Sequence, residues 1–239
     1  MEYNFTMRTI PQIFAMLFLS GLIFAQGKSE EANMKTVLGK IHWLGHAATR
    51  IDADKTIYID PWKIKQGSKP ADIILITHDH YDHCSMIDVE KVQKKETIIV
   101  TTPDCAKKLK GDIKTVKPGD KINANGFDIE AVPAYNLDKE FHPKSRGWVG
   151  FIITVEGVGI YQTGDTDATE EMKALKVDIA LMPVGGTYTM TAKESAAAAN
   201  IFKPKVVIPI HWGDIVGSVA DAETFKKIFT GETLILTRE

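Results

Sequence analysis

Side chains of the metal-binding types crowd into the segment ITHDHYDHCS, residues 76–85. Within six positions it holds the imidazoles of His78, His80 and His83 and the carboxylates of Asp79 and Asp82. Imidazole nitrogen and carboxylate oxygen are the ligands that a borderline transition metal such as zinc prefers. The whole chain has only seven histidines, so three of them directly after the apolar run IILI are not the scatter expected of a polar loop. The segment therefore predicts a metal site.

The elements that must position these side chains alternate between short strands and helices after residue 35. KIHWLG, ATRID and TIYIDP are typical of three antiparallel strands, and WVGFIITVEGVGIYQTGD predicts a hairpin that turns at Glu156 and Gly157. Thr191 and Glu194 have the spacing of a capping box at the start of the helix TAKESAAAANIFK. The apolar run TLILTR predicts a final strand. Together these patterns predict one α/β domain with two sheets covered by helices.

Polar clusters follow the ends of four of the apolar runs. THDHYDH follows IILI, GDTD follows GIYQT, HWGD follows VVIPI, and VGGTYT follows IALMP. Strand ends grouped at one edge of a sheet are where α/β proteins build their sites. Asp165 and His211 occupy equivalent positions after their strands, which the general polarity of loops does not explain. Both are therefore expected at the same edge as the histidine cluster.

The composition is that of an ordinary globular protein. The chain has 239 residues, of which 44% are hydrophobic and 25% charged, enough for one large domain or two small ones. A net charge of −2 without a long Lys/Arg stripe gives no electrostatic reason to expect a nucleic-acid partner. Cys84 and Cys105 are too few for a disulfide framework but allow one bridge. Cys84 follows the histidine cluster, where a buried neutral thiol is favoured over thiolate ligation of a metal.

The N-terminus has the outline of a secretory signal peptide. IFAMLFLSGLIFA is an uncharged run of thirteen residues whose last alanine begins the exit AQG, and the polar KSEEAN comes next. A membrane span needs about twenty residues, so this run is short for one, and its exit fits signal cleavage. We expect residues 1–27 to be a signal peptide, and the protein to be periplasmic or secreted with no stable membrane insertion of the mature chain. An uncleaved anchor and a buried helix are the alternatives.

The motif THDHYDH resembles the T-H-x-H-x-D-H signature of the metallo-β-lactamase fold hydrolases. Asp60 in IDPW, Asp165 in TGDTD and His211 in IPIHW follow in the order that this family has. WLGHAATRI and IYIDPW are most similar to the branch that contains ascorbate-6-phosphate lactonase and the N-acylphosphatidylethanolamine phospholipase D enzymes. The resemblance implies a four-layer αββα sandwich with mixed sheets, and a metallo-β-lactamase-like hydrolase domain at residues 28–239.

The resemblance also implies two divalent metal ions between the sheets, zinc first, with manganese or iron as the other choices. The ligands it implies are His78 and His80 for the first ion, Asp82, His83 and His211 for the second, and Asp165 as the bridge. Asp60 would accept a hydrogen bond from a ligand and orient it. Two cations about 3.5–4 Å apart polarise an oxygen and bind hydroxide at neutral pH, so the chemistry agrees with the implied site.

One ligand of the family pattern is missing. Tyr135 stands at the end of IEAVPAYN, where the third histidine of the first metal is expected. A neutral phenol, with a reference pKa of about 10, is a poor zinc ligand. His142 lies seven residues further along, and the connecting loop is long enough to curl back. We therefore expect His142 to face the metal centre, as a ligand or as a group that acts on substrate; otherwise the first metal is weakly held or absent.

Other polar residues allow two interpretations each. His46 in WLGH can face the metals or substrate, or pack as a hydrogen-bonded core residue, whereas His42 is expected to be structural. The segment 185–189 can contact substrate through backbone amides or simply form the turn before a helix. Lys144 and Arg146 can receive an anionic group or remain solvated.

The expected activity is metal-dependent hydrolysis of a small-molecule substrate. Metal-bound hydroxide attacks a carbonyl or phosphoryl centre, the second metal stabilises the oxyanion, and Asp82 or Asp165 handles the proton. The similarity to the lactonase branch favours a small ester or lactone, and a phosphodiester is the alternative within the same fold. An iron-dependent redox enzyme and a non-catalytic metal-binding protein are the alternatives from other classes. Metal content together with turnover distinguishes all four.

Overall fold

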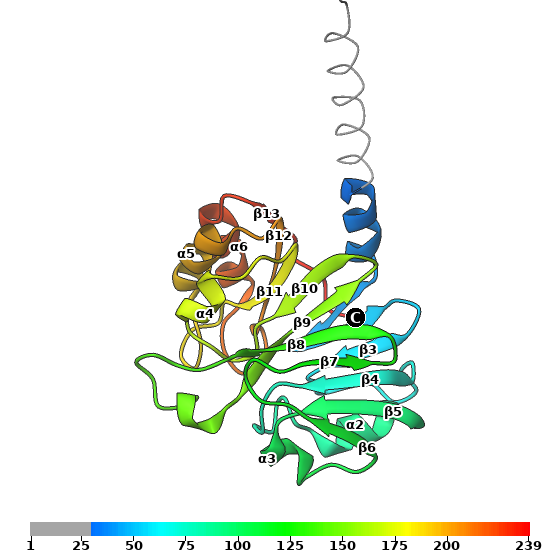
Figure 1. The fold of residues 1–239 in the computed structure, drawn as a ribbon. Coiled ribbons are helices and arrows are strands. Elements are labelled where there is room, and N and C mark those ends of the chain that lie inside the picture. Colours follow the sequence, from blue (N-terminus) through cyan, green and yellow to red (C-terminus); the bar gives the residue numbers. More distant parts are fainter. Residues whose placement is uncertain (1–29) are drawn as a thin grey trace, which may run out of the picture.

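The computed structural model describes residues 30–239, whose strands form two stacked sheets (Figure 1). In the first sheet the strands lie in chain order: β1 (Ile41–Gly45), β2 (Ala48–Asp52), β3 (Thr56–Ile59), β4 (Ala71–Ile76), β5 (Gln93–Thr101) and β6 (Asp112–Thr115). The second sheet runs, also in order, through β7 (Lys121–Ala124), β8 (Phe127–Pro133), β9 (Val149–Val155), β10 (Val158–Gln162), β11 (Ile179–Pro183), β12 (Val206–Ile210) and β13 (Glu232–Thr233). The predicted signal peptide at residues 1–27 lies outside the described residues.

The first sheet combines the antiparallel start that the sequence predicts with a parallel half. β1, β2 and β3 pair antiparallel, and β3 to β6 pair parallel. Parallel strands are covered on both faces, which is why ADIILI in β4 is a nearly continuous apolar run. Helices α2 (Met86–Val92) and α3 (Pro103–Ala106) cover the outer face, where Val89, Val92 and Cys105 pack against Ile74 and Ile99.

The second sheet contains the predicted hairpin. Val155 pairs with Val158, and the turn residues Glu156 and Gly157 have φ values of 50° and 79°, the left-handed backbone of a tight hairpin turn. β10 to β13 are parallel to one another. Their outer face is covered by α4 (Glu170–Lys173), α5 (Ala192–Phe202) and α6 (Val219–Ile228). The predicted capping box is confirmed at the start of α5.

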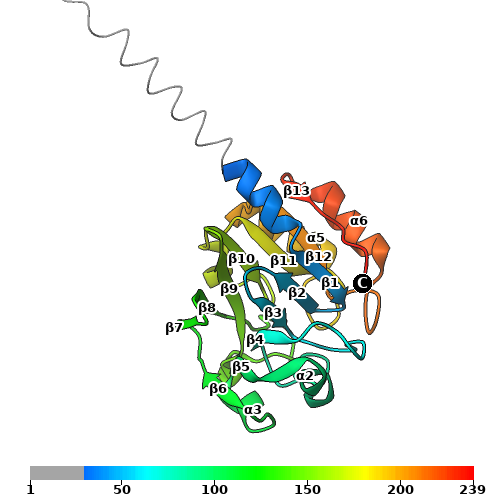
Figure 2. The same cartoon turned by 90° about the vertical axis from the view of Figure 1, so that its right-hand side faces the viewer.

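The predicted final strand TLILTR is wrong in extent. β13 contains only Glu232 and Thr233, which pair with the start of β12. The backbone N–H of Leu234 still donates to the carbonyl of Val207 in β12 at 2.9 Å, and beyond it the tail runs to the first sheet. The backbone N–H of Glu239 donates to the carbonyl of Trp43 at 3.1 Å, and Figure 2 shows the C-terminal end beside β1.

The inner faces of the two sheets form the largest apolar core. Ile73 and Leu75 from β4 lie in one cluster with Phe151 from β9 and Leu181 from β11, all fully buried. With α2 and α3 on one side and α4, α5 and α6 on the other, the layers are helix, sheet, sheet and helix (Figure 1). The expected four-layer αββα sandwich with mixed sheets is confirmed. Within residues 30–239, whose first nine residues are helical, no helix has the length and apolarity to cross a membrane.

Candidate metal centre

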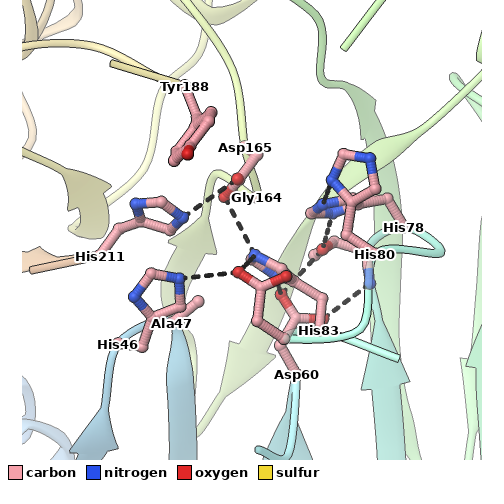
Figure 3. Close-up of polar contacts among 12 residues, drawn as sticks. His46, Ala47, Asp60, His78, His80, His83, Gly164, Asp165, Tyr188 and His211 are labelled. Atoms are coloured by element: carbon pink, nitrogen blue, oxygen red, sulfur yellow. Dashed lines mark hydrogen bonds and ion pairs between the residues drawn. The ribbon is translucent and has the colours of Figure 1, made fainter. Parts of the chain in front are cut away.

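Histidines and aspartates from four separate segments meet at one edge of the two sheets (Figure 3). The segment after β4 contributes His78, His80, Asp82 and His83, the third residue after β10 is Asp165, and the residue directly after β12 is His211. The loop between β8 and β9 contributes His142. All except the half-buried His80 are buried. The structure thus brings together every residue that the sequence nominated for the metals or for catalysis.

The first donor group consists of His78, His80 and His142, which offer one nitrogen each within 4.8 Å of one another. His142 is held by Asn136, whose Oδ1 accepts hydrogen bonds from the backbone N–H and from Nδ1 of His142, both at 3.0 Å. With Nδ1 engaged there, Nε2 is turned inward to 3.3 Å from Oδ2 of Asp165. His142 therefore faces the cluster from the loop.

Tyr135 lies beside this group but does not take part in it. Its hydroxyl donates to Oε2 of Glu171 at 2.8 Å and accepts from Nζ of Lys144 at 3.2 Å. The phenol is thus engaged by a carboxylate and an ammonium group outside the cluster. The six residues that follow Tyr135 bring the imidazole of His142 to His78 and His80 instead.

The second donor group consists of Asp82, His83, His211 and His46, again within 4.8 Å of one another. Nδ1 of His83 donates to Oδ2 of Asp60 at 2.8 Å, and Nε2 of His83 lies 3.3 Å from Oδ1 of Asp165. Asp60 is itself fixed, because its Oδ1 accepts from the backbone N–H of the residue after β4 at 2.8 Å. Asp60 thus makes the orienting contact that the family resemblance implies.

His46 contacts the second donor group directly. Its Nε2 lies 3.0 Å from Oδ2 of Asp82, its carbonyl accepts from the backbone N–H of His211 at 2.8 Å, and its side chain is fully buried. Its φ of 51° is left-handed, a conformation that costs a non-glycine residue about 1–3 kcal/mol. The fold therefore holds this imidazole against the Asp82 carboxylate in spite of local strain.

The carboxylate of Asp165 lies between the two donor groups. Its Oδ2 is 3.3 Å from Nε2 of His142 and 3.1 Å from Nε2 of His211, while Oδ1 is 3.3 Å from Nε2 of His83. One carboxylate therefore reaches ligands of both groups, as a bridging residue must.

Several donor atoms of the cluster lack a hydrogen-bond partner within residues 30–239 and are available to bind cations. The buried side-chain nitrogens without a hydrogen-bond partner include Nε2 of His83, His142 and His211. A buried polar atom that makes no hydrogen bond costs about 1–3 kcal/mol, so three of them around one carboxylate call for a ligand. Imidazole nitrogens with carboxylate oxygens suit zinc, manganese or iron. The residues present therefore fit two divalent cations, with Asp165 shared between them.

The pKa values in the cluster reflect its burial and the charge of Asp165. Burial lowers the pKa of His78 well below its usual value. Burial acts in the same direction on His83, but the carboxylates of Asp165 and Asp60 outweigh it and raise its pKa well above the usual value. Burial raises the pKa of Asp165, yet the charges of His211 and His83 more than offset this and lower it. Asp165 is thus held as a carboxylate, the form that binds a metal.

A pocket of about 230 Å³ opens above the cluster. It is lined by His80, Tyr81, Asp82, Phe141, His142, Asp165, Tyr188, His211 and Ile215. Gly185, at the end of β11, lies so close to the carbonyl of His211 that an added Cβ would stand 2.3 Å from it. The segment 185–189 therefore packs against the site and presents Tyr188 to the pocket, in addition to forming the turn before α5.

The remaining residues considered from sequence lie around the site without lining this pocket. Cys84 and Cys105 are free and buried, and their mutual hydrogen bond, together with burial, raises the pKa of the Cys84 thiol. His42 contacts Asp52 and Glu239 in the first sheet, a structural position. The sequence reasoning did not single out Asn136, whose role depends on where its neighbours fold, and the residue type alone gives no signal for it.

The fold and the donor set define a metallohydrolase-type αββα protein with a histidine and aspartate cluster able to bind metal. The Beta-lactamase superfamily domain model matches residues 40–211, and the chain belongs to this family. It is 35% identical over 205 residues to a UPF0173 metal-dependent hydrolase of Thermococcus onnurineus, covering 79% of this chain and 91% of that one. A UPF0173 metal-dependent hydrolase of Methanoregula boonei is 34% identical, with 77% and 86% covered.

Solved structures agree with this assignment. A protein of Parabacteroides distasonis superposes with a TM-score of 0.74 at 34% identity, covering 83% of this chain and 93% of that chain. Igni18, a metallo hydrolase of Ignicoccus hospitalis, has the same fold, with a TM-score of 0.66 at 22% identity and 82% and 94% covered. The chain is thus a metal-dependent hydrolase of the metallo-β-lactamase fold.

Proposed function

We propose that this protein hydrolyses a small, uncharged carboxylic ester or lactone. The observation that carries the proposal is the lining of the pocket above the cluster: within residues 30–239, no lysine or arginine lines it. Lysine and arginine are among the groups, besides metal ions, with which enzymes stabilise the charge of a reacting phosphoryl group. Such a residue is not needed for an ester, whose carbonyl develops charge at a single oxygen.

The lysine and arginine side chains that lie close in sequence to the pocket residue His142 form ion pairs with carboxylates instead. In the loop that carries His142, Nζ of Lys139 lies 2.6 Å from Asp167, and Nζ of Lys144 lies 3.0 Å from Glu171. Arg146 contacts the carboxylates of Asp79 and Asp104 at 3.0 and 3.3 Å. These contacts support a site that takes a neutral substrate.

The chain's own residues have separate tasks in this reaction. When bound, divalent cations supply polarisation of the substrate oxygen and a lowered pKa of water. The imidazoles and Asp165 hold them, and burial of the cluster excludes bulk water from the reacting carbonyl. Hydrolysis forms one C–O bond from water, breaks the acyl C–O bond and moves one proton to the leaving alkoxide.

Asp82 is the closest carboxylate to the pocket besides Asp165, and its environment keeps it ionised. Burial raises its pKa, but the hydrogen bond from His46 and the charge of His83 outweigh this and lower the pKa to about 2. A carboxylate of this kind holds a proton only in passing. We therefore propose that Asp82 passes the proton of the attacking water on towards the leaving group, and that its longer-lived task is to bind a metal.

The test is a substrate screen of the full-length protein loaded with Zn²⁺ or Mn²⁺. We expect turnover of small p-nitrophenyl esters and lactones that is lost with a chelator and restored by the metal. Asp165→Ala should lower this turnover by more than about a hundredfold, since its loss removes the shared ligand. His42→Ala, outside the cluster, should keep both metal and turnover. Faster cleavage of bis(p-nitrophenyl) phosphate than of any ester would instead assign a phosphodiesterase, and two bound metals without turnover of either class would overturn the proposal.

Export of the protein is a second proposal, independent of the site, that rests on residues 1–27 alone. If they are a cleaved signal peptide, protein recovered from the native envelope or medium should have the mass of a chain that begins near Lys28. An intact mass that includes residues 1–27 on soluble protein would contradict it.

A further inference from the structure

The pocket above the cluster has a floor and walls of different chemistry. The metal-binding side chains form its floor, whereas its walls are Tyr81, Phe141, Tyr188 and Ile215. Two of these wall residues are strongly exposed, Tyr81 at 69% and Phe141 at 46%. A single exposed aromatic side chain on a protein surface is ordinary. Two that border the same pocket, together with a third ring and an isoleucine, form an apolar entrance over a polar floor.

The aromatic walls are supported by contacts with each other and with residues outside the pocket. The rings of Phe141 and Tyr188 meet edge to face, with centroids 4.7 Å apart and an interplanar angle of 84°. The backbone carbonyl of Tyr188 accepts a hydrogen bond from Nδ2 of Asn136 at 3.0 Å. On the other wall, Tyr81 lies edge-on to Trp62 with centroids 6.2 Å apart. Because both walls are supported, the apolar entrance is already shaped for a ligand.

The same asparagine links a wall to the floor. Asn136 holds His142 through Oδ1 and the Tyr188 carbonyl through Nδ2. One side chain therefore connects His142 in the floor to Tyr188 in the wall. A substrate that contacts both is positioned by this frame.

We infer that the walls bind a short aliphatic acyl chain. The preferred substrate is then an ester or lactone whose acyl chain is short and carries no charge. This inference deepens the proposed function and rests on it. The pocket volume of about 230 Å³ limits the length of the chain. It is smaller than the about 300–1,000 Å³ of clefts that enclose drug-sized ligands. An anionic chain would lose its hydration between these walls without gaining a partner.

The expected effect is a dependence of kcat/KM on chain length. Burial of one methylene contributes about 0.8 kcal/mol, which corresponds to about a fourfold gain. From p-nitrophenyl acetate to the butyrate, two methylenes are added, so kcat/KM should rise by about fifteenfold. The gain should stop with longer chains, once the pocket is filled.

The experiment compares p-nitrophenyl acetate, butyrate, hexanoate and hemisuccinate on the full-length, Zn²⁺-loaded protein. Hemisuccinate has a chain similar in length to that of butyrate but ends in a carboxylate, so it isolates the effect of charge. We expect butyrate to exceed both acetate and hemisuccinate. Equal values for all three, or a preference for hemisuccinate, would overturn the inference.

Two variants assign the effect to the wall. Phe141→Ala should bring the butyrate-to-acetate ratio close to one, and Phe141→Leu, which keeps an apolar side chain, should retain part of it. Ile201→Ala is the matched control, since Ile201 is 56% exposed on α5 and does not line the pocket. A ratio that survives in Phe141→Ala would exclude this wall as its origin.

A binding measurement separates this inference from the proposed function. Aceto-, butyro- and succinamic hydroxamic acids are titrated calorimetrically into the same metal-loaded protein, which needs no turnover. Tighter binding of the butyro compound, by about fifteenfold and lost in Phe141→Ala, supports the apolar walls even if no ester is hydrolysed. Ester turnover with equal dissociation constants for the three would support the proposed function and overturn the chain preference.

Discussion

The two donor groups of the metal centre differ in how the fold holds them. In the second group, Asp82, His83 and His211 come from the segments after β4 and β12. His83 has Asp60 as a buried partner, and Asp82 has His46, the fourth member of the group. The first group takes its third ligand, His142, from the loop between β8 and β9. One asparagine fixes that loop against the ligand.

This difference suggests different metal affinities in one centre. Residues at strand ends inherit the rigidity of the sheet, and residues on a loop depend on the few contacts that fix it. His80 is also only half-buried, whereas the ligands of the second group are all buried. We therefore expect the second donor group to bind its cation more tightly and the first to lose its cation first on dilution or chelation.

The largest effect is expected for Asp165, the residue that both groups share. Asp165→Ala should reduce bound metal from two ions towards none or one, because its two oxygens face ligands on both sides. Removing it also leaves the cations near under-coordinated imidazoles. Metal content by mass spectrometry, with circular dichroism as the check on folding, measures this. Two retained ions in the folded variant would refute the assignment of Asp165 as the bridge.

Single-ligand variants should separate the groups. His211→Ala is expected to remove the second cation and His142→Ala the first, so that each retains about one metal per chain. Tyr135→Phe is the matched control for the loop, because the Tyr135 hydroxyl contacts Glu171 and Lys144 and not the cluster. It should keep two ions and most of the activity. Equal losses from His142→Ala and Tyr135→Phe would mean that the loop acts only through its packing.

A smaller and more selective effect is expected at Asn136. Partners that orient a metal ligand typically change metal affinity by about 10–100-fold. Asn136→Ala should weaken the first cation by this amount and leave the second unchanged, because it frees the His142 imidazole without removing it. Asn200→Ala on α5 is the control, since the side-chain hydrogen bonds of Asn200 within residues 30–239 go to Ile228 and Thr230, far from His142 in the chain. Competition with a chromophoric chelator resolves the two affinities, and an equal loss at both would contradict the independence of the donor groups.

The ligands at strand ends were predictable from sequence in a way that the loop ligand His142 was not. His83 and Asp82 lie inside a recognisable motif, and Asp165 and His211 follow apolar runs whose ends must meet at one sheet edge. The same reasoning correctly anticipated the four layers and the hairpin at Glu156. Periodicity predicts where strands run, and strand ends then place their own side chains.

Loop geometry depends on contacts that no periodicity records. His142 could be nominated only because a histidine was missing at Tyr135, and the orientation of its ring depends on Asn136. The final strand was shorter than predicted for a related reason: TLILTR has the right residue types, but its bonding to β12 ends with Leu234, and Glu239 at the end of the tail binds Trp43 of β1 instead. In both cases a long-range contact decides the local structure.

The smallest expected effect concerns Asp88, which stabilises the helix after the ligand loop. Asp88, in the first turn of α2, is buried and accepts hydrogen bonds from the backbone N–H groups of Lys63 and Ile64 and from Nζ of Lys91. It thereby ties the segment after β3 to the helix that begins directly after the ligand loop. Hydrogen bonds to a charged group contribute about 1.5–3 kcal/mol each, so Asp88→Asn should lower the free energy of unfolding by about 1–3 kcal/mol.

The pH dependence of this loss has a definite sign. Burial raises the pKa of Asp88, but the hydrogen bonds from Lys91 and Ser85 outweigh it and lower the pKa below its usual value. The unfolded chain therefore binds a proton at higher pH than the folded one, near the reference pKa of about 3.9. The stabilisation is complete above that value and is lost as the pH falls through the folded pKa. Urea unfolding of both proteins in chelator should show a difference at pH 7 that shrinks below about pH 4. A difference in the free energy of unfolding that stays constant across this range would show that Asp88 acts through its shape. A stabilising effect of its charge would then be excluded.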